Sequence, residues 1–299
     1  MNALLAGVEI GGTKCVCTLA TCPDDIQAQI HVPTTSPERT LGNIATVLDQ
    51  WRLKYGFLAL GIASFGPLEL DTKSPALGTL VRTPKVSWSG ANLTSLAGHE
   101  PFAIQTDVNA AAIAEGRWGA ARGLASWAYI TVGTGVGVGS VVAGQPLTGL
   151  GHSEAGHLRI PGVDTIFGAC PYHGDCVEGQ ASGPALEAGS GIPGPDIPPD
   201  HPVLERAAKA LAYLCHNLVY TSLPQRILIG GGVILDRPIL LTRIQEHLVR
   251  SLSDYGAGHE IAENMLDYLV MPQLGKQAGP MGSICLAAEA LDRSVNPAC

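Results

Sequence analysis

Two similar segments constrain the fold of this chain more than any other feature of its sequence. Residues 3–20 and residues 127–143 each consist of an apolar run, a cluster of Gly and Thr, and a second apolar run. Two strand-like runs joined by a tight Gly-rich turn predict a β-hairpin. Glycine lets the backbone turn tightly and brings its N–H groups close to a bound anion. One such hairpin at the start of each half predicts two related halves that hold a polyphosphate between them, which is typical of a phosphotransferase.

The first turn does not have the pattern of a P-loop. A P-loop has Gly, four further residues, and then Gly-Lys-Ser/Thr at the start of a helix. Here residues 11–14 (GGTK) are followed by residues 15–17 (CVC), which are typical of a strand. Each Gly-rich turn alone is a weak signal, because such turns are common without a ligand. The pair of turns is the stronger signal.

The composition excludes several function classes. With 299 residues, of which 46% are hydrophobic and 15% charged, the chain is long enough for two folded domains. The formal net charge of −8, without a run of Lys or Arg, argues against a nucleic-acid partner. There is no uninterrupted apolar stretch of membrane-spanning length and no basic leader with a cleavage site. We therefore expect no membrane partner and a cytoplasmic location.

Periodicity and turn residues predict a similar order of elements in each half. After the first hairpin we expect a strand at 27–33, a helix from residue 37, a strand at 57–63, a strand at 102–106 and a helix at 107–118. After the second we expect an irregular insertion at 145–200, a helix at 201–218, a strand at 226–229, a helix at 239–252, a strand at 265–271 and a helix at 282–291. This order predicts two α/β domains with a cleft between them, at residues 1–107 and 108–281, with 282–299 closing back on the first.

Six short motifs follow one another along the chain. They are residues 7–14 (GVEIGGTK), 107–111 (DVNAA), 131–137 (TVGTGVG), 151–157 (GHSEAGH), the Cys/His segment 170–178 and 229–233 (IGGGV). In this order they resemble the ROK family of sugar kinases and repressors, and within it the fructokinase-like branch. The resemblance covers essentially the whole chain. It implies an actin/hexokinase-like (ribonuclease H-like) fold with a small zinc-binding insertion at about residues 150–180, and a homodimer. ROK repressors carry a DNA-binding domain before the first hairpin, which begins here at residue 3, so we expect an enzyme.

Asp107 is the candidate general base of the kinase reaction that the resemblance implies. Such a reaction needs a group that takes the proton of the attacking hydroxyl. Asp107 follows an expected strand and starts an expected helix, and it matches the catalytic aspartate of the family. The alternative is that Asp107 only caps the helix. Many ROK glucokinases have a sugar-binding Asn just before this Asp, whereas Thr106 stands here, which agrees with the fructokinase-like branch.

The resemblance also implies the residues that bind MgATP. The ATP phosphates would be held at Gly11, Gly12, Thr13, Lys14, Gly133, Thr134 and Gly135. For Lys14, a solvated lysine is the alternative. Glu9, where many relatives have Asp, would help to hold the water shell of Mg²⁺ indirectly. Gly230, Gly231 and Gly232 match the adenosine-binding loop, where missing side chains admit the nucleotide, and an ordinary strand-to-helix turn is the alternative.

Sugar contacts and a zinc site are implied in the second half. Glu154, His157 and Glu178 match positions that hydrogen-bond sugar hydroxyls, together with Asp107, and Asn92 is a further candidate whose alternative is a turn role. A zinc site is predicted at His157, Cys170, His173 and Cys176, because two thiolates and two imidazoles complete a tetrahedral, structural Zn²⁺ site. His152 is interpreted as a loop residue.

The sequence thus predicts ATP-dependent phosphorylation of a hexose at its 6-hydroxyl, with D-fructose giving D-fructose 6-phosphate. The alternatives are the same reaction on mannose, glucose or an N-acetylated hexosamine, and a catalytically silent sugar-binding regulator.

Overall fold

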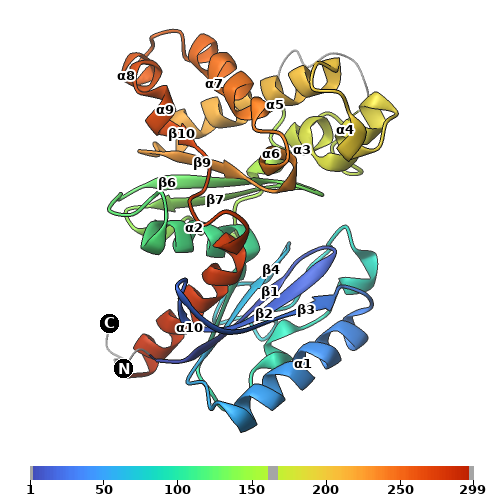
Figure 1. Ribbon diagram of the computed structural model, residues 1–299, viewed down its shortest axis with the longest axis vertical. Helices are drawn as coiled ribbons and strands as arrows, with labels where there is room; N and C mark the ends of the chain where they lie inside the picture. The colour runs from blue at the N-terminus through green and yellow to red at the C-terminus, as the bar shows by residue number, and fades with distance from the viewer. Residues whose placement is uncertain (1–2, 161–167, 296–299) are drawn as a thin grey trace. The chain divides into compact units, whose positions relative to one another are not determined.

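The computed structural model describes residues 3–160 and 168–295, and the chain divides into two compact units (Figure 1). Unit 1 contains the described parts of Met1–Trp118, Thr148–His152 and Lys276–Cys299, and unit 2 contains those of Gly119–Leu147 and Ser153–Gly275. The helix that begins at Asp107 and the C-terminal helix therefore both belong to unit 1.

Unit 1 is built on a five-stranded sheet of order β3-β2-β1-β4-β5. Its elements are β1 (Leu5–Ile10), β2 (Lys14–Cys22), β3 (Asp25–Pro33), α1 (Pro37–Lys54), β4 (Leu60–Ser64), η1 (Val86–Trp88), η2 (Leu93–Leu96), β5 (Phe102–Thr106), α2 (Asp107–Trp118) and α10 (Ala278–Val295). The first three strands are antiparallel, and β1, β4 and β5 are parallel. Helix α10 packs on the sheet and against α2. Helix α1 begins after Ser36, whose side chain accepts a hydrogen bond from the Arg39 N–H, and buries Ile44, Leu48 and Trp51.

Unit 2 repeats this topology. Its sheet, read as β8-β7-β6-β9-β10, has the same sequence of antiparallel and parallel pairings as β3-β2-β1-β4-β5. Its elements are β6 (Trp127–Val132), β7 (Val136–Val142), β8 (Gln145–Pro146), η3 (Ala155–His157), α3 (Val177–Ala181), α4 (Gly183–Ser190), η4 (Gly194–Asp196), α5 (Pro202–Thr221), β9 (Ile227–Gly230), α6 (Gly232–Leu235), α7 (Ile239–Leu252), α8 (Gly258–Glu263), α9 (Met265–Tyr268) and β10 (Leu269–Val270). The short η5 (Gly275–Gln277) begins at the last residue of unit 2 and continues into unit 1. The two related halves expected from the paired hairpins are present.

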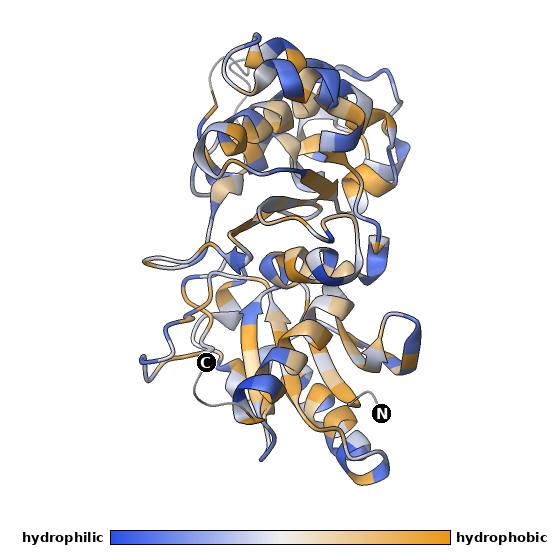
Figure 2. Ribbon diagram, turned by 90° about the vertical axis from the view of Figure 1, so that its left-hand side faces the viewer, coloured by the Kyte–Doolittle hydropathy of each residue, from blue (hydrophilic) through white to orange (hydrophobic). Residues whose placement is uncertain are grey.

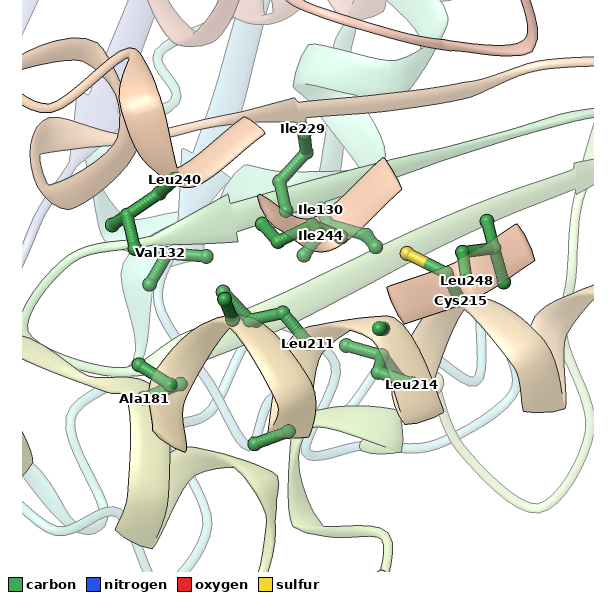
Figure 3. Packing of buried hydrophobic residues seen from close by; sticks show 14 of the residues in the cluster. Ile130, Val132, Ala181, Leu211, Leu214, Cys215, Ile229, Leu240, Ile244 and Leu248 are labelled. Atoms are coloured by element: carbon green, nitrogen blue, oxygen red, sulfur yellow. The ribbon is translucent and has the colours of Figure 1, made fainter. Parts of the chain in front are cut away.

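The core of unit 2 lies between its sheet and its helices. Figure 3 shows Leu211 and Leu214 of α5 among Ile130 of β6 and Ile244 of α7, and all four are buried. The spacing of apolar residues along α5 and α7 places one stripe of each helix in this core. Figure 2 shows the strands of both units mainly in hydrophobic colours. Across the described ranges, no helix combines the length and apolar character needed to cross a membrane.

The structure corrects two expected elements. The stretch 265–271 was expected to be a strand, but it forms the short helix α9 and only the two-residue strand β10. Met265 and Tyr268 are buried whereas Leu266 is exposed, which is a helical spacing. The insertion expected to be irregular contains α3 and α4. Helix α4 carries ordinary end signals, with Ser182 as its N-cap and Gly191 in the left-handed conformation at its C-cap.

Candidate active site and metal centre

Three parallel strands end at one edge of the unit 1 sheet. Ile10 of β1 lies beside Ser64 of β4, and Ser64 lies beside Thr106 of β5. The Gly-rich turn at residues 11–14 follows Ile10, and Asp107 follows Thr106. Open α/β sheets bind ligands at the carboxyl ends of their strands. The first candidate phosphate turn and the candidate base therefore leave the sheet at the same edge.

Asp107 is the first residue of α2, but its neighbour caps the helix. The buried Thr106 hydroxyl accepts a hydrogen bond from the Asn109 N–H at 3.3 Å, and Asp107 Oδ1 accepts one from the Val108 N–H at 2.8 Å. Burial raises the pKa of Asp107, against the opposing effects of the Val108 N–H and the charge of His152. Because Thr106 supplies the cap, the helix does not depend on Asp107 for capping. A carboxylate with a raised pKa is suited to accept a proton, so Asp107 is suited to act as a general base.

Glu9, on β1, is an acidic neighbour of Asp107. The pKa of Glu9 is raised from 4.5 to about 7, first by burial and then by the charge of Asp107, against the opposing charge of Lys14. Because the charge of Asp107 opposes the ionisation of Glu9, a cation beside the two side chains would be favourable, which is consistent with the indirect Mg²⁺ role expected for Glu9.

The shifted pKa of Glu9 predicts a pH-dependent stability. In the unfolded chain Glu9 titrates near 4.5, whereas in the folded chain it holds its proton until about pH 7. Its stabilising contribution is therefore complete below pH 4.5 and is lost as the pH rises through 7, by on the order of 3 kcal/mol. We expect Glu9→Gln to remove this slope and to have the higher unfolding free energy at pH 8, measured by urea titration without Mg²⁺. Exposed Glu38→Gln is the control, and equal slopes for wild type and Glu9→Gln would contradict the assignment.

The first Gly-rich turn presents unpaired donors. The Gly11 N–H donates to the Lys14 carbonyl at 3.1 Å, and the Thr34 N–H donates to the Thr13 carbonyl at 3.0 Å. Among the described residues, the N–H groups of Gly12 and Thr13 make no hydrogen bond. Adjacent free N–H groups in a turn are a common anion-binding arrangement.

The second Gly-rich turn, in unit 2, has the same property. Gly133 N–H donates to the Gly135 carbonyl at 2.9 Å, and the Val136 N–H donates to Glu178 Oε2 at 3.0 Å. Within residues 3–160 and 168–295, the N–H groups of Thr134 and Gly135 remain without a partner. The Glu178 carboxylate thus fixes this turn, a contact between two of the expected site segments that the sequence did not reveal.

A pocket of about 1000 Å³ in unit 2 adjoins the second turn. Gly133 and Thr134 line it, as do Gly232 and Val233 at the start of α6. The other two expected adenosine residues, Gly230 and Gly231, are not among the lining residues of the pocket. Gly230 abuts Pro272, and Gly231, at φ +88°, approaches the Val132 carbonyl too closely for any Cβ.

The Pro-rich segment 194–199 forms one wall of this pocket, and its role was not predicted from the sequence. Glu187 Oε1 accepts a hydrogen bond from the Gly194 N–H at 2.8 Å, and the Arg237 guanidinium donates to the Gly194 carbonyl. Both side chains line the pocket, together with Asp236. The proline content of the segment is a signal for a rigid loop, but no signal in the sequence pairs it with Glu187 and Arg237.

The four expected zinc ligands converge. Their ligand atoms all lie within 4.8 Å of one another, and His157 Nδ1 is 3.7 Å from Cys170 Sγ and 3.6 Å from Cys176 Sγ. His173 Nδ1 is 3.8 Å from Cys170 Sγ. Tetrahedral Zn²⁺ with bonds of about 2.3 Å to sulfur and about 2.0 Å to nitrogen would separate these atoms by about 3.6 Å. The donor set and its spacing therefore fit zinc.

The sugar-contact candidates of unit 2 surround this centre. His157 turns Nδ1 toward the thiols, while its Nε2 is 4.0 Å from Glu154 Oε2 and its Nδ1 is 3.9 Å from Glu178 Oε1. A ligand histidine commonly has a carboxylate near its second nitrogen, which fixes the ring. The structure thus brings Glu154, His157 and Glu178 together.

Asn92, in unit 1, has a different environment. Its Nδ2 donates to the Leu77 carbonyl and to Thr79 Oγ1, and its Oδ1 accepts from the Thr94 N–H and hydroxyl. These four bonds use the capacity of the amide, as the turn alternative requires. We therefore leave Asn92 out of the sugar site that we propose.

His152, interpreted from the sequence as a loop residue, lies near the unit 1 strand edge. Its Nε2 accepts a hydrogen bond from the Leu68 N–H at 3.1 Å, and its ring packs on Gly66. Its charge acts on Asp107. It thus connects the loop that follows β4 with the surroundings of the candidate base, and only the tertiary structure brings it there.

Comparison with known proteins places the chain in a family. The sequence profile of the ROK family matches residues 5–290. The chain is 38% identical over 296 residues to the fructokinase of Zymomonas mobilis, covering 95% of this chain and 96% of the relative. It is 35% identical over 294 residues to the fructokinase of Pediococcus pentosaceus, covering 96% and 99%.

A solved structure agrees with these relatives. The ROK family glucokinase from Streptomyces griseus, in complex with glucose and AMPPNP, is 25% identical with a TM-score of 0.76, covering 96% of this chain and 100% of that chain. The two mixed sheets described above have the expected actin/hexokinase-like fold. The chain therefore belongs to the ROK family.

Proposed function

We propose that this chain is an ATP-dependent hexose kinase that converts D-fructose to D-fructose 6-phosphate. The observation that carries the proposal is the strand edge of unit 1, where a turn with two free N–H groups follows β1 and Asp107 follows β5, the two parallel strands on either side of β4. Relatives named fructokinase at 32–38% identity support the choice of fructose. By family resemblance we also propose a cytoplasmic homodimer.

In the proposed reaction, Asp107 accepts the proton of the fructose 6-hydroxyl as its oxygen bonds to the γ-phosphorus and the bond to ADP breaks. In each unit, the free N–H groups of the Gly-rich turn would bind phosphate oxygens. Mg²⁺ bound to ATP neutralises phosphate charge, and Glu9 would hold its water shell.

The unit 2 pocket would bind the adenosine. Its position beside Thr134 connects a nucleoside site with a phosphate turn. Val233 and Ile197 offer apolar surface to the base, and the exposed Asp236 offers carboxylate oxygens to the ribose hydroxyls.

Glu154, His157 and Glu178 would bind the sugar hydroxyls. Zinc, held by His157, Cys170, His173 and Cys176, supplies a structural cross-link that fixes this segment, because four protein ligands fill its coordination.

The test is ADP release with MgATP and fructose, mannose, glucose or N-acetylmannosamine, compared as kcat/KM. We expect fructose to give the highest value. A preference for another of these sugars would retain the mechanism and correct the substrate. Sugar binding without turnover of any of them would replace the kinase by a silent sugar-binding regulator.

A further inference from the structure

Lys85 is a cation that the proposed reaction has not yet used, and it lies beside the first Gly-rich turn. A Cβ at Gly12 would be only 3.8 Å from Lys85 Cε. The charge of Lys85 also reaches Cys15, whose pKa burial raises and Lys85 helps to lower. The fold thus brings two distant parts of the sequence together at the turn.

The loop before η1 fixes the backbone of Lys85. Its N–H donates to Thr83 Oγ1 at 3.4 Å, and its carbonyl accepts from the Trp88 N–H at 2.7 Å. Trp88 is fully buried, and its Nε1–H donates to the Thr35 carbonyl at 2.9 Å. Lys85 therefore lies in a loop that Trp88 anchors, and its side chain already reaches the turn at Gly12.

Within the described ranges Lys85 forms no ion pair, although its charge lies beside the free N–H groups of Gly12 and Thr13. Lys14 differs from Lys85 in having an acidic neighbour, because its charge lowers the pKa of Glu9. A cation without a counter-charge and two free donors at one turn form a site for a phosphate group. The sequence motifs pointed only to Lys14 as a cation for this turn.

We propose that Lys85 binds the γ-phosphoryl group of ATP during its transfer, an inference that rests on the proposed kinase function. The turn shares its strand edge with Asp107, so a phosphate held there would lie at the same edge of the sheet as the group that we propose as the base. The sugar oxygen bonds to the γ-phosphorus, the bond from that phosphorus to the bridging oxygen of ADP breaks, and Asp107 takes the hydroxyl proton. Lys85 keeps its proton and stabilises charge on the non-bridging oxygens.

The experiment compares Lys85→Met, Lys85→Arg and the exposed control Lys73→Met with wild type. We measure kcat with MgATP and fructose, the Kd of MgADP, and the calorimetric Kd of inorganic tripolyphosphate.

Lys85→Met should lower kcat by about 10- to 100-fold, the loss expected for a charged hydrogen bond. MgADP affinity should stay unchanged because ADP lacks the γ-phosphoryl group, and tripolyphosphate binding should weaken. Lys85→Arg should recover part of kcat, and Lys73→Met should match wild type.

The outcomes separate this inference from the proposed function. If wild type phosphorylates fructose and Lys85→Met keeps its kcat within about twofold, the inference is wrong and the kinase stands. If wild type phosphorylates none of the four sugars, the kinase is wrong. In that case weaker tripolyphosphate binding by Lys85→Met still supports the phosphate site, and equal binding overturns it.

Discussion

Asp107→Asn is expected to lower kcat by about 10²- to 10⁴-fold, the usual contribution of a general base. Asparagine keeps an oxygen that accepts the Val108 N–H, and Thr106 still caps α2. The variant should therefore retain sugar binding, measured by calorimetry, and a melting temperature no lower than that of wild type. Because burial raises the pKa of Asp107, the kcat of wild type should rise with pH over a range above that of an exposed aspartate.

The control is Asp24→Asn, an exposed residue in the turn at the opposite end of β2 from the Gly-rich turn. It should leave both kcat and its pH profile unchanged. A kcat of Asp107→Asn close to that of wild type would exclude Asp107 as the base. A fall in kcat accompanied by an equal loss of sugar affinity and a lower melting temperature would indicate a structural role instead.

Cys170→Ser is expected to have the second largest effect, because it removes a ligand from a centre whose four donor atoms lie within 4.8 Å. Zinc content, measured by atomic emission, should fall from about one per chain to a small fraction of that. Without the metal, His157 loses its orientation toward Glu154 and Glu178. Losing one or two charged hydrogen bonds to the sugar should raise the KM for fructose by at least about tenfold.

Cys22→Ser is the matched control, because Cys22 lies at the end of β2 and outside the Cys/His cluster. It should keep both its zinc and its KM. Prolonged chelation of wild type should reproduce the Cys170→Ser values, and zinc added back to the chelated protein should restore them. Purified protein that carries no stoichiometric zinc and is fully active would exclude the structural metal.

Local patterns in the sequence predicted much of the fold. The hairpins, α1, β5 and α2 were all readable, because turn residues, caps and apolar spacing act over a few neighbouring residues. Short elements were harder, since α3 in the insertion and β10 near the end of unit 2 contain only five and two residues, too few for a repeating apolar period. The segment 265–271 was misread for this reason.

The residues of the candidate site likewise fall into two groups, those that the sequence revealed and those that only the structure revealed. Three of the four expected zinc ligands are close in sequence, so Cys170, His173 and Cys176 could be recognised from their spacing. Lys85 could not, because it lies in no motif, and His152 was interpreted only as a loop residue although it lies in the motif at residues 151–157. Each is significant only through a partner distant in sequence, Gly12 for Lys85 and Leu68 for His152. The same holds for Glu178, whose bond to the Val136 N–H fixes the second turn.

The sequence by itself determined the family, the duplicated topology and the residue types available for phosphate, base and metal chemistry, because these depend on order and spacing along the chain. Only the tertiary structure decided which side chains reach which turn, that Asp107 lies close enough to Glu9 to raise its pKa, and that Asn92 is occupied by its own loop. Distances of a few ångströms govern hydrogen bonding and electrostatics, and those distances exist only after parallel strands and distant loops have packed.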